Sequence, residues 1–170
     1  MKAGHPFRVL VLCTGNSARS QIGEALFAVR GATRFARTVE AESAGSHPAS
    51  RVNPYAVETL AHHDIRWDGR TPKSIAEVEG RPFDLVITVC GNAREACPYF
   101  PGATAQVHWG LPDPADVATP DAAREAFART YDALSERVDA LLALPLEAMD
   151  AGQLSAAASR IHDTRPVPVF

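Results

Sequence analysis

Short apolar runs rich in β-branched residues alternate along the chain with longer stretches of helical periodicity. The runs at Phe7–Leu12 and Phe83–Val89 are the clearest, and each is typical of a buried strand. Thr38–Ser43 and Ala105–His108 predict two shorter strands. The pattern therefore predicts four strands, well separated in the sequence.

Helical signals fill the intervals between these strands. Ser20 is expected to cap a helix that stops near Gly31. Asn53 and Pro54 suit the N-cap and the first position of a second helix, which we expect to run to about His63. Further helices are predicted over Ser74–Val78, over Pro120 to about Leu144, and over Ala151–Ile161.

Strands that alternate with helices predict an α/β fold, a doubly wound parallel four-stranded sheet flanked by helices. Ligands of such sheets bind at the carboxyl ends of the strands. Cys13 and Cys90 each follow a buried strand directly, so we expect both sulfurs at the same edge of the sheet. The 170 residues suit one domain, predicted over 1–144, with a C-terminal extension over 145–170.

Composition narrows the function classes. The net charge of -3 argues against broad nucleic-acid binding. The longest apolar run, Val9–Cys13, is too short to cross a bilayer, and the N-terminus shows no secretory signal. We therefore expect a cytoplasmic monomer. Three cysteines argue against a static disulfide scaffold, and neither they nor the scattered histidines have metal-site spacing, so we predict no metal site.

The segment Cys13–Ser20 carries the strongest candidate chemistry. A loop between a strand and a helix directs backbone N–H groups and the positive end of the helix toward an anion. Arg19 adds a planar fork that matches two oxygens of a tetrahedral oxyanion, and this field favours the thiolate of Cys13. The alternative is a buried structural cysteine and a solvated arginine. The predicted oxyanion loop consists of Thr14, Gly15, Asn16, Ser17, Ala18, Arg19 and Ser20.

These residues resemble the loop of the low-molecular-weight protein tyrosine phosphatases and of the arsenate reductases built on the same fold. The resemblance covers roughly residues 7–142 and continues in Ser43-Ala44-Gly45, Asn53-Pro54, Val86-Ile87-Thr88-Val89-Cys90, Cys97-Pro98 and His108-Trp109-Gly110-Leu111-Pro112-Asp113-Pro114. Both classes begin with attack of the loop cysteine on the oxyanion, so other residues must separate them.

The resemblance implies that Asp113 is the general acid that protonates the leaving oxygen. Its alternative role is that of a turn residue, since Asp-Pro is common in loops. The phosphatases usually have a tyrosine where this chain has Ala115, and a second loop cysteine where it has Ala18. Both differences favour the reductases.

Cys90 and Cys97 match the thioredoxin-coupled arsenate reductases in spacing. That resemblance implies a cascade in which Cys13 attacks arsenate, Cys90 attacks Cys13 and releases arsenite, and Cys97 then attacks Cys90. Thioredoxin, or a glutaredoxin or mycothiol system, reduces the last disulfide, and no cofactor is bound. The alternatives are a low-molecular-weight tyrosine phosphatase and a thiol-based redox or metalloid sensor.

Two finer expectations complete the sequence analysis. Some relatives bind potassium through groups matching Asn16, Glu24 and Ser43 and an aspartate, where this chain has Lys73. We expect its ammonium to replace the cation, and therefore no potassium site. A helix over residues 90–97 would hold its end Cα atoms about 10 Å apart, beyond the roughly 7 Å limit of a disulfide, so residues 91–98 are predicted to rearrange on oxidation.

Overall fold

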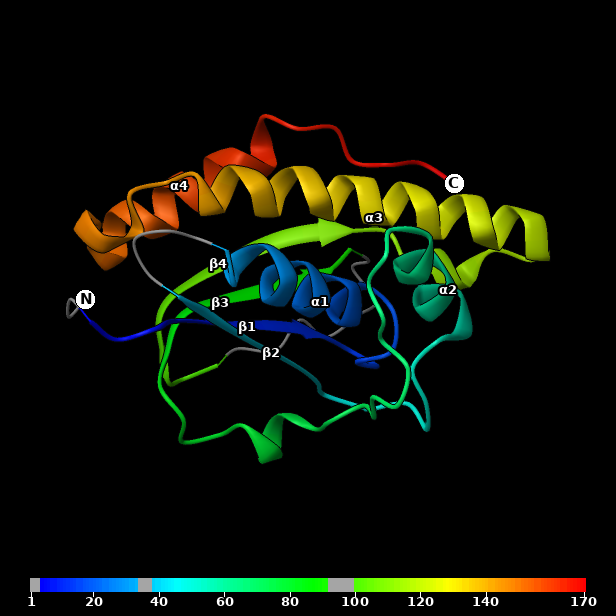
Figure 1. The fold of residues 1–170 in the computed structure, drawn as a ribbon, viewed down its shortest axis with the longest axis horizontal. Helices are drawn as coiled ribbons and strands as arrows, with labels where there is room; N and C mark the ends of the chain where they lie inside the picture. The colour runs from blue at the N-terminus through cyan, green and yellow to red at the C-terminus, as the bar shows by residue number, and fades with distance from the viewer. Residues whose placement is uncertain (1–3, 34–37, 92–99) are drawn as a thin grey trace.

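The computed structural model describes residues 4–33, 38–91 and 100–170. Its strands form one parallel sheet in the order β2-β1-β3-β4 (Figure 1). The strands are β1 (Phe7–Cys13), β2 (Val39–Gly45), β3 (Phe83–Cys90) and β4 (Ala103–Leu111). The predicted fold class is confirmed.

The helices connect and cover the strands. They are α1 (Arg19–Gly31), α2 (Pro54–His62), α3 (Pro120–Leu142) and α4 (Ala151–Asp163), with the short 3-10 turns η1 (Ile75–Glu77), η2 (Pro114–Asp116) and η3 (Leu146–Ala148). Val9 and Val11 of β1 face the main core with all four helices, whereas Leu10 and Leu12 face a smaller cluster with Phe100. Within the described ranges, no helix is long and apolar enough to cross a membrane.

The local signals for helix starts were partly right. Asn53 caps α2 as predicted, since its Oδ1 accepts a hydrogen bond from Tyr55 N at 2.9 Å. The prediction that Ser20 caps the first helix is wrong: α1 begins at Arg19, and its N-cap Ala18 makes no side-chain bond. The Ser20 hydroxyl instead lies 2.9 Å from Cys13 Sγ.

The connections reverse direction between β1 and β3. From β1 the chain passes to β2 on one side, and from β3 it passes to β4 on the other. Ligands of doubly wound sheets bind in the crevice at such a reversal, outside the carboxyl ends of the strands. Cys13 ends β1 and Cys90 ends β3, so the expectation that both lie at this edge is confirmed.

The C-terminal segment packs onto the sheet and onto α3. Figure 1 shows α4 beside β4 and the last residues returning along α3. Trp109 Nε1 donates to Ala158 O of α4 at 2.9 Å. Arg137 of α3 is fully buried and donates to His162 Nδ1 at 3.0 Å and to Pro166 O at 3.1 Å. The boundary expected near residue 144 stays a prediction.

Candidate active site

Cys13 has two hydrogen-bonding groups at its sulfur. Ser20 Oγ lies 2.9 Å from Cys13 Sγ, and the backbone N–H of Asn16 donates to the same atom at 3.2 Å. Cys13 is only 3 % exposed to solvent. Donors around a poorly solvated sulfur stabilise negative charge on it, as a thiolate nucleophile requires.

Asn16 shapes the loop from a fully buried position. Its φ of 48° lies in the left-handed region that asparagine tolerates better than most residues. Its Nδ2 donates to Ser20 Oγ at 2.9 Å and to Ser43 Oγ at 2.8 Å. Its Oδ1 accepts from Gln21 Nε2 at 3.1 Å and from Lys73 N at 2.8 Å. These bonds at both ends of the amide set its orientation.

Glu24 extends this network away from the sulfur. Ser43 Oγ donates to Glu24 Oε2 at 2.6 Å. Burial raises the pKa of Glu24, while the Ser43 hydrogen bond and the charges of Lys73 and Arg70 act in the opposite direction. Lys73 Nζ contacts Glu42 at 3.2 Å and Arg70 contacts Glu24 at 3.9 Å, so the replacement of a cation by the Lys73 ammonium stays a prediction. The absence of a potassium site stays a prediction.

Arg19 and Asp113 come together across the loop. Arg19 is 3 % exposed, its NH1 donates to Leu111 O at 2.8 Å, and its NH2 lies 3.3 Å from Asp113 Oδ2. Asp113 Oδ1 also accepts from Ala115 N at 3.0 Å, so the turn role and the proximity to Arg19 coexist. In the described part of the chain, the buried Thr14 Oγ1 has no hydrogen-bond partner, which suits a donor to an oxyanion.

A second loop supports the first through its backbone. Residues 46–53 run beside the oxyanion loop, where His47 N donates to Thr14 O and Ala49 N donates to Gly15 O, both at 2.8 Å. Ser17 Oγ donates to Arg51 O at 2.9 Å, so this hydroxyl anchors the loop to residues 46–53. Ala18 is buried in the main core.

Sequence reasoning missed two residues behind the loop. Gln21 is 2 % exposed, and its Nε2 donates to Asn16 O at 3.0 Å. Trp67 Nε1 donates to Gln21 Oε1 at 2.8 Å and so fixes that side chain. The available signal was a polar residue next to the apolar stripe of the first helix, but Trp67 lies in a segment without regular periodicity.

Cys90 is a cysteine buried in the main core, only 1 % exposed. The register Leu12↔Thr88 sets Cys13 and Cys90 one residue apart on adjacent parallel strands. Strand spacing then places their Cα atoms about 6 Å apart, within disulfide range. Cys97 and the predicted redox segment after Gly91 lie outside the described residues.

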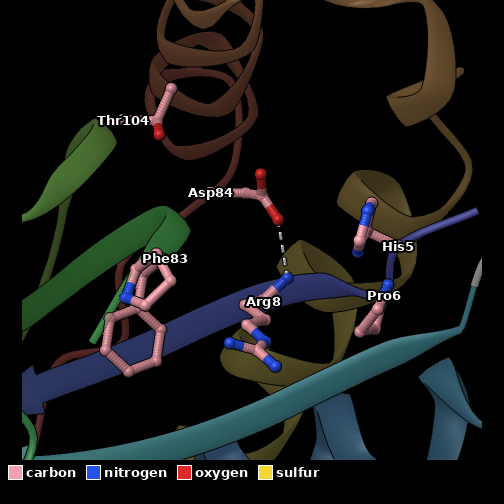
Figure 2. Close-up of a pocket in the computed structure, with 7 residues that line it drawn as sticks. His5, Pro6, Arg8, Phe83, Asp84 and Thr104 are labelled. Atoms are coloured by element: carbon pink, nitrogen blue, oxygen red, sulfur yellow. Dashed lines mark hydrogen bonds between the residues drawn. The ribbon is translucent and has the colours of Figure 1, made fainter. Parts of the chain in front are cut away.

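A separate pocket of about 450 Å³ lies at the amino ends of β1, β3 and β4 (Figure 2). Arg8 N donates to Asp84 Oδ2 across it at 2.9 Å. None of the predicted site residues lines this pocket. The candidate active site lies at the other end of the strands, where Cys13 and Cys90 end β1 and β3. Across the described residues, no group of three or more His, Cys, Asp or Glu side chains is placed to hold a metal ion.

A cysteine in an anion-binding loop, an arginine inside that loop and a carboxyl group facing the arginine are the arrangement typical of enzymes that attack tetrahedral oxyanions through a thiolate. Within this class, the chain belongs to the low molecular weight phosphotyrosine protein phosphatase family, whose sequence profile matches residues 8–153. The resemblance drawn from the loop sequence and the expectation of an enzyme are confirmed.

Relatives within the family are named arsenate reductases. The one from Halalkalibacterium halodurans is 35% identical over 131 residues, covering 76% of this chain and 91% of its own. The structure of an arsenate reductase in a phosphate-binding state matches with a TM-score of 0.66 and 28% identity, covering 81% of this chain and 97% of that one. A thioredoxin-dependent arsenate reductase from Corynebacterium glutamicum matches with a TM-score of 0.55 and 28% identity, covering 81% and 64%.

Proposed function

We propose that this protein reduces arsenate to arsenite through three thiols in series and is regenerated by thioredoxin. The observation that carries the proposal is the position of two buried cysteines, Cys13 and Cys90, at the ends of neighbouring strands beside an oxyanion loop. A phosphatase needs only the first of these thiols. The similarity to named arsenate reductases supports the same reaction.

The first step forms a bond between Cys13 Sγ and arsenic. The loop N–H groups and Arg19 bind the arsenate oxygens, and the thiolate attacks the arsenic atom. The As–O bond on the opposite side breaks, and its oxygen takes a proton from Asp113 and leaves as water. Arg19 NH2 already lies 3.3 Å from Asp113, so both groups can act on one bound oxyanion.

The second step reduces the arsenic. Cys90, as a thiolate, attacks Cys13 Sγ, and the electron pair of the S–As bond stays on arsenic, which leaves as arsenite. Cys97 then attacks Cys90, so that Cys13 is released as a thiolate and the disulfide moves to Cys90–Cys97. The dithiol of thioredoxin reduces this disulfide and supplies the two electrons that arsenic received.

Burial explains why a third thiol is useful. Cys13 is 3 % exposed and Cys90 is 1 % exposed, so a protein reductant cannot reach a disulfide between them. In the proposed cycle the disulfide therefore passes to Cys90–Cys97 before thioredoxin reduces it. The proposed cycle needs no metal, flavin or nicotinamide on this chain, works in a monomer, and suits the reducing conditions of the cytoplasm.

The test is arsenate-dependent oxidation of NADPH in the presence of thioredoxin and its reductase, with the variants Cys13→Ser, Cys90→Ser and Cys97→Ser. Each variant is expected to lose multiple turnover. Ser159→Ala, an exposed change on α4, is the control and should remain active. Glutathione with glutaredoxin, and mycothiol, replace thioredoxin in parallel reactions to identify the reductant.

Two results would contradict the proposal. Full arsenate turnover by Cys90→Ser and Cys97→Ser would exclude the cascade. Rapid cleavage of phosphate esters by the same variants, with no arsenate reduction by the unmodified protein, would make the protein a phosphatase.

A further inference from the structure

The strand β4 contains a bulge beside the candidate active site. Thr88 pairs with His108, but Cys90 pairs with Leu111, so two steps along β3 correspond to three along β4. The extra residue lies in the segment Trp109–Gly110. Bulges of this kind redirect the residues that follow them and are common next to active sites.

Leu111, which follows the bulge, accepts a hydrogen bond from Arg19. Arg19 NH1 donates to the backbone carbonyl of Leu111 at 2.8 Å, inside a region where both residues are buried. This acceptor is neutral, so the bond is independent of whether Asp113 carries a proton. Leu111 therefore orients the guanidinium at every stage of a reaction in which Asp113 loses its proton.

Trp109 connects this bulge to the C-terminal segment. Its side chain is fully buried, and its Nε1 donates to Ala158 O of α4 at 2.9 Å. Ala158 is fully buried as well and lies beyond residue 153, where the match to the family ends. The position of the bulge is thus tied to a part of α4 that lies beyond the family match.

We propose that Trp109 is a positioning residue for the oxyanion site and that α4 fixes the Trp109 side chain in place. Through its bond to Ala158, Trp109 holds the bulge so that the Leu111 carbonyl orients Arg19 toward two oxygens of the substrate. The C-terminal helix α4 then contributes to oxyanion binding through Trp109. This inference rests on the oxyanion site of the proposed function, not on the later thiol steps.

The direct test is Trp109→Phe, which keeps most of the ring volume and removes the indole N–H. Inorganic phosphate is the probe, and its Kd is measured by protection of Cys13 from iodoacetamide. We expect the Kd to rise about five-fold, the equivalent of one net hydrogen bond. The alkylation rate without phosphate should not change, because the bonds from Ser20 and Asn16 to the sulfur are untouched.

Tyr131→Phe is the matched control. It also removes one polar group from a buried aromatic ring. The Tyr131 hydroxyl accepts from Arg30 NH2 at 3.4 Å, and neither residue belongs to β4. Its phosphate Kd should equal that of the unmodified protein. A merely structural role for Trp109 would lower the thermal midpoint of unfolding in the same way as the control and leave the Kd of the folded protein unchanged.

A double-mutant cycle with Arg19→Ala identifies the route of the effect. Trp109→Phe should have no further effect on phosphate binding once the guanidinium is absent. An unchanged Kd in the single variant, or an equal loss in both backgrounds, would overturn the inference. Phosphate protection together with failed arsenate turnover would count against the proposed reductase and leave the role of Trp109 intact.

Discussion

Asn16 Nδ2 donates to Ser20 Oγ at 2.9 Å, and a Cys13 thiolate can only accept from that hydroxyl. Because the Ser20 hydroxyl accepts from Asn16, its single proton is available for Cys13 Sγ, 2.9 Å away. The same reasoning applies to Ser43, which accepts from Asn16 and donates to Glu24. A directed series of hydrogen bonds therefore runs from the buried amide to the sulfur in one direction and to a buried carboxyl group in the other.

Ser20→Ala should slow the reaction of Cys13 with iodoacetamide at neutral pH by about ten-fold, because the thiolate loses a charge-assisted hydrogen bond. The measurement is the pH dependence of the alkylation rate. Ser159→Ala, which changes an exposed serine on α4, should leave the profile unchanged. An unchanged profile for Ser20→Ala would mean that the hydroxyl does not stabilise the thiolate.

Asp113→Asn should reduce single-turnover arsenate reduction by about a hundred-fold, the typical loss on removal of a general acid. Phosphate binding should become tighter, because the carboxylate 3.3 Å from Arg19 NH2 no longer competes with the oxyanion. Asp116→Asn, on the exposed side of the same turn, is the control. Weaker phosphate binding in Asp113→Asn would instead assign Asp113 a role in holding the loop.

Glu24→Gln should change how stability depends on pH. Burial raises the pKa of Glu24 above its usual 4.5, so the native state binds the proton more tightly than the unfolded state. This contribution is complete below pH 4.5 and is lost as the pH rises through the raised pKa. The stability advantage of the unmodified protein over the variant should therefore shrink from pH 4.5 to pH 7 in urea denaturation. Exposed Glu79→Gln should show no such trend.

His162→Asn should remove a loss of stability at acidic pH. Burial, and then the charge of Arg137, lower the pKa of His162 from its usual 6.5, while Asp163 opposes and His108 adds to the shift. Its contribution is present above pH 6.5 and is lost as the pH falls through the lowered pKa, because a protonated Nδ1 cannot accept from Arg137. Asparagine Oδ1 accepts without titrating.

The measurement is amide hydrogen exchange across residues 160–168 between pH 7 and pH 5. Exchange in the unmodified protein should rise as the pH falls, relative to the intrinsic rate, and the His162→Asn variant should show a flat ratio. His62→Asn, at an exposed position on α2, controls for the loss of a histidine. Equal pH dependence in all three proteins would exclude His162 as the cause.

Gly91→Ala should destabilise the fold by about 2 kcal/mol, because an added Cβ overlaps the backbone of Leu111. The same shift would move the carbonyl that holds Arg19, so phosphate binding should weaken as well. Gly152→Ala is the matched control in the first turn of α4, where a Cβ meets only Asp150 Oδ1 at 3.4 Å. Its stability should not fall, since alanine is the better helix former.

The sequence predicted the sheet and the sulfur-binding loop because both depend on local patterns. Phe7–Leu12 and Phe83–Val89 are continuous enough to be recognised as buried strands, and the loop residues are contiguous. The sequence predicted the fourth strand only over Ala105–His108, whereas β4 runs over Ala103–Leu111 and contains the bulge. Bulges have no pattern of their own in a single sequence.

Residues that act from other elements were harder to predict. Trp67 and Leu111 reach the site through tertiary contacts, one by a side chain on Gln21 and the other by a backbone carbonyl. Any residue type can supply a backbone carbonyl, so the sequence carries no signal for this acceptor. Ser20 was misassigned for a related reason, since capping and donation to sulfur use the same hydroxyl and only the fold decides between them.

The edge strand β2 shows how the protein avoids unwanted association. Its exposed Glu40 pairs with Arg8, and Glu42 pairs with Lys73 and Arg81. An unpaired strand edge can add a strand from another molecule, and a line of charged side chains makes that addition costly. These ion pairs thus disfavour the joining of two molecules edge to edge along β2.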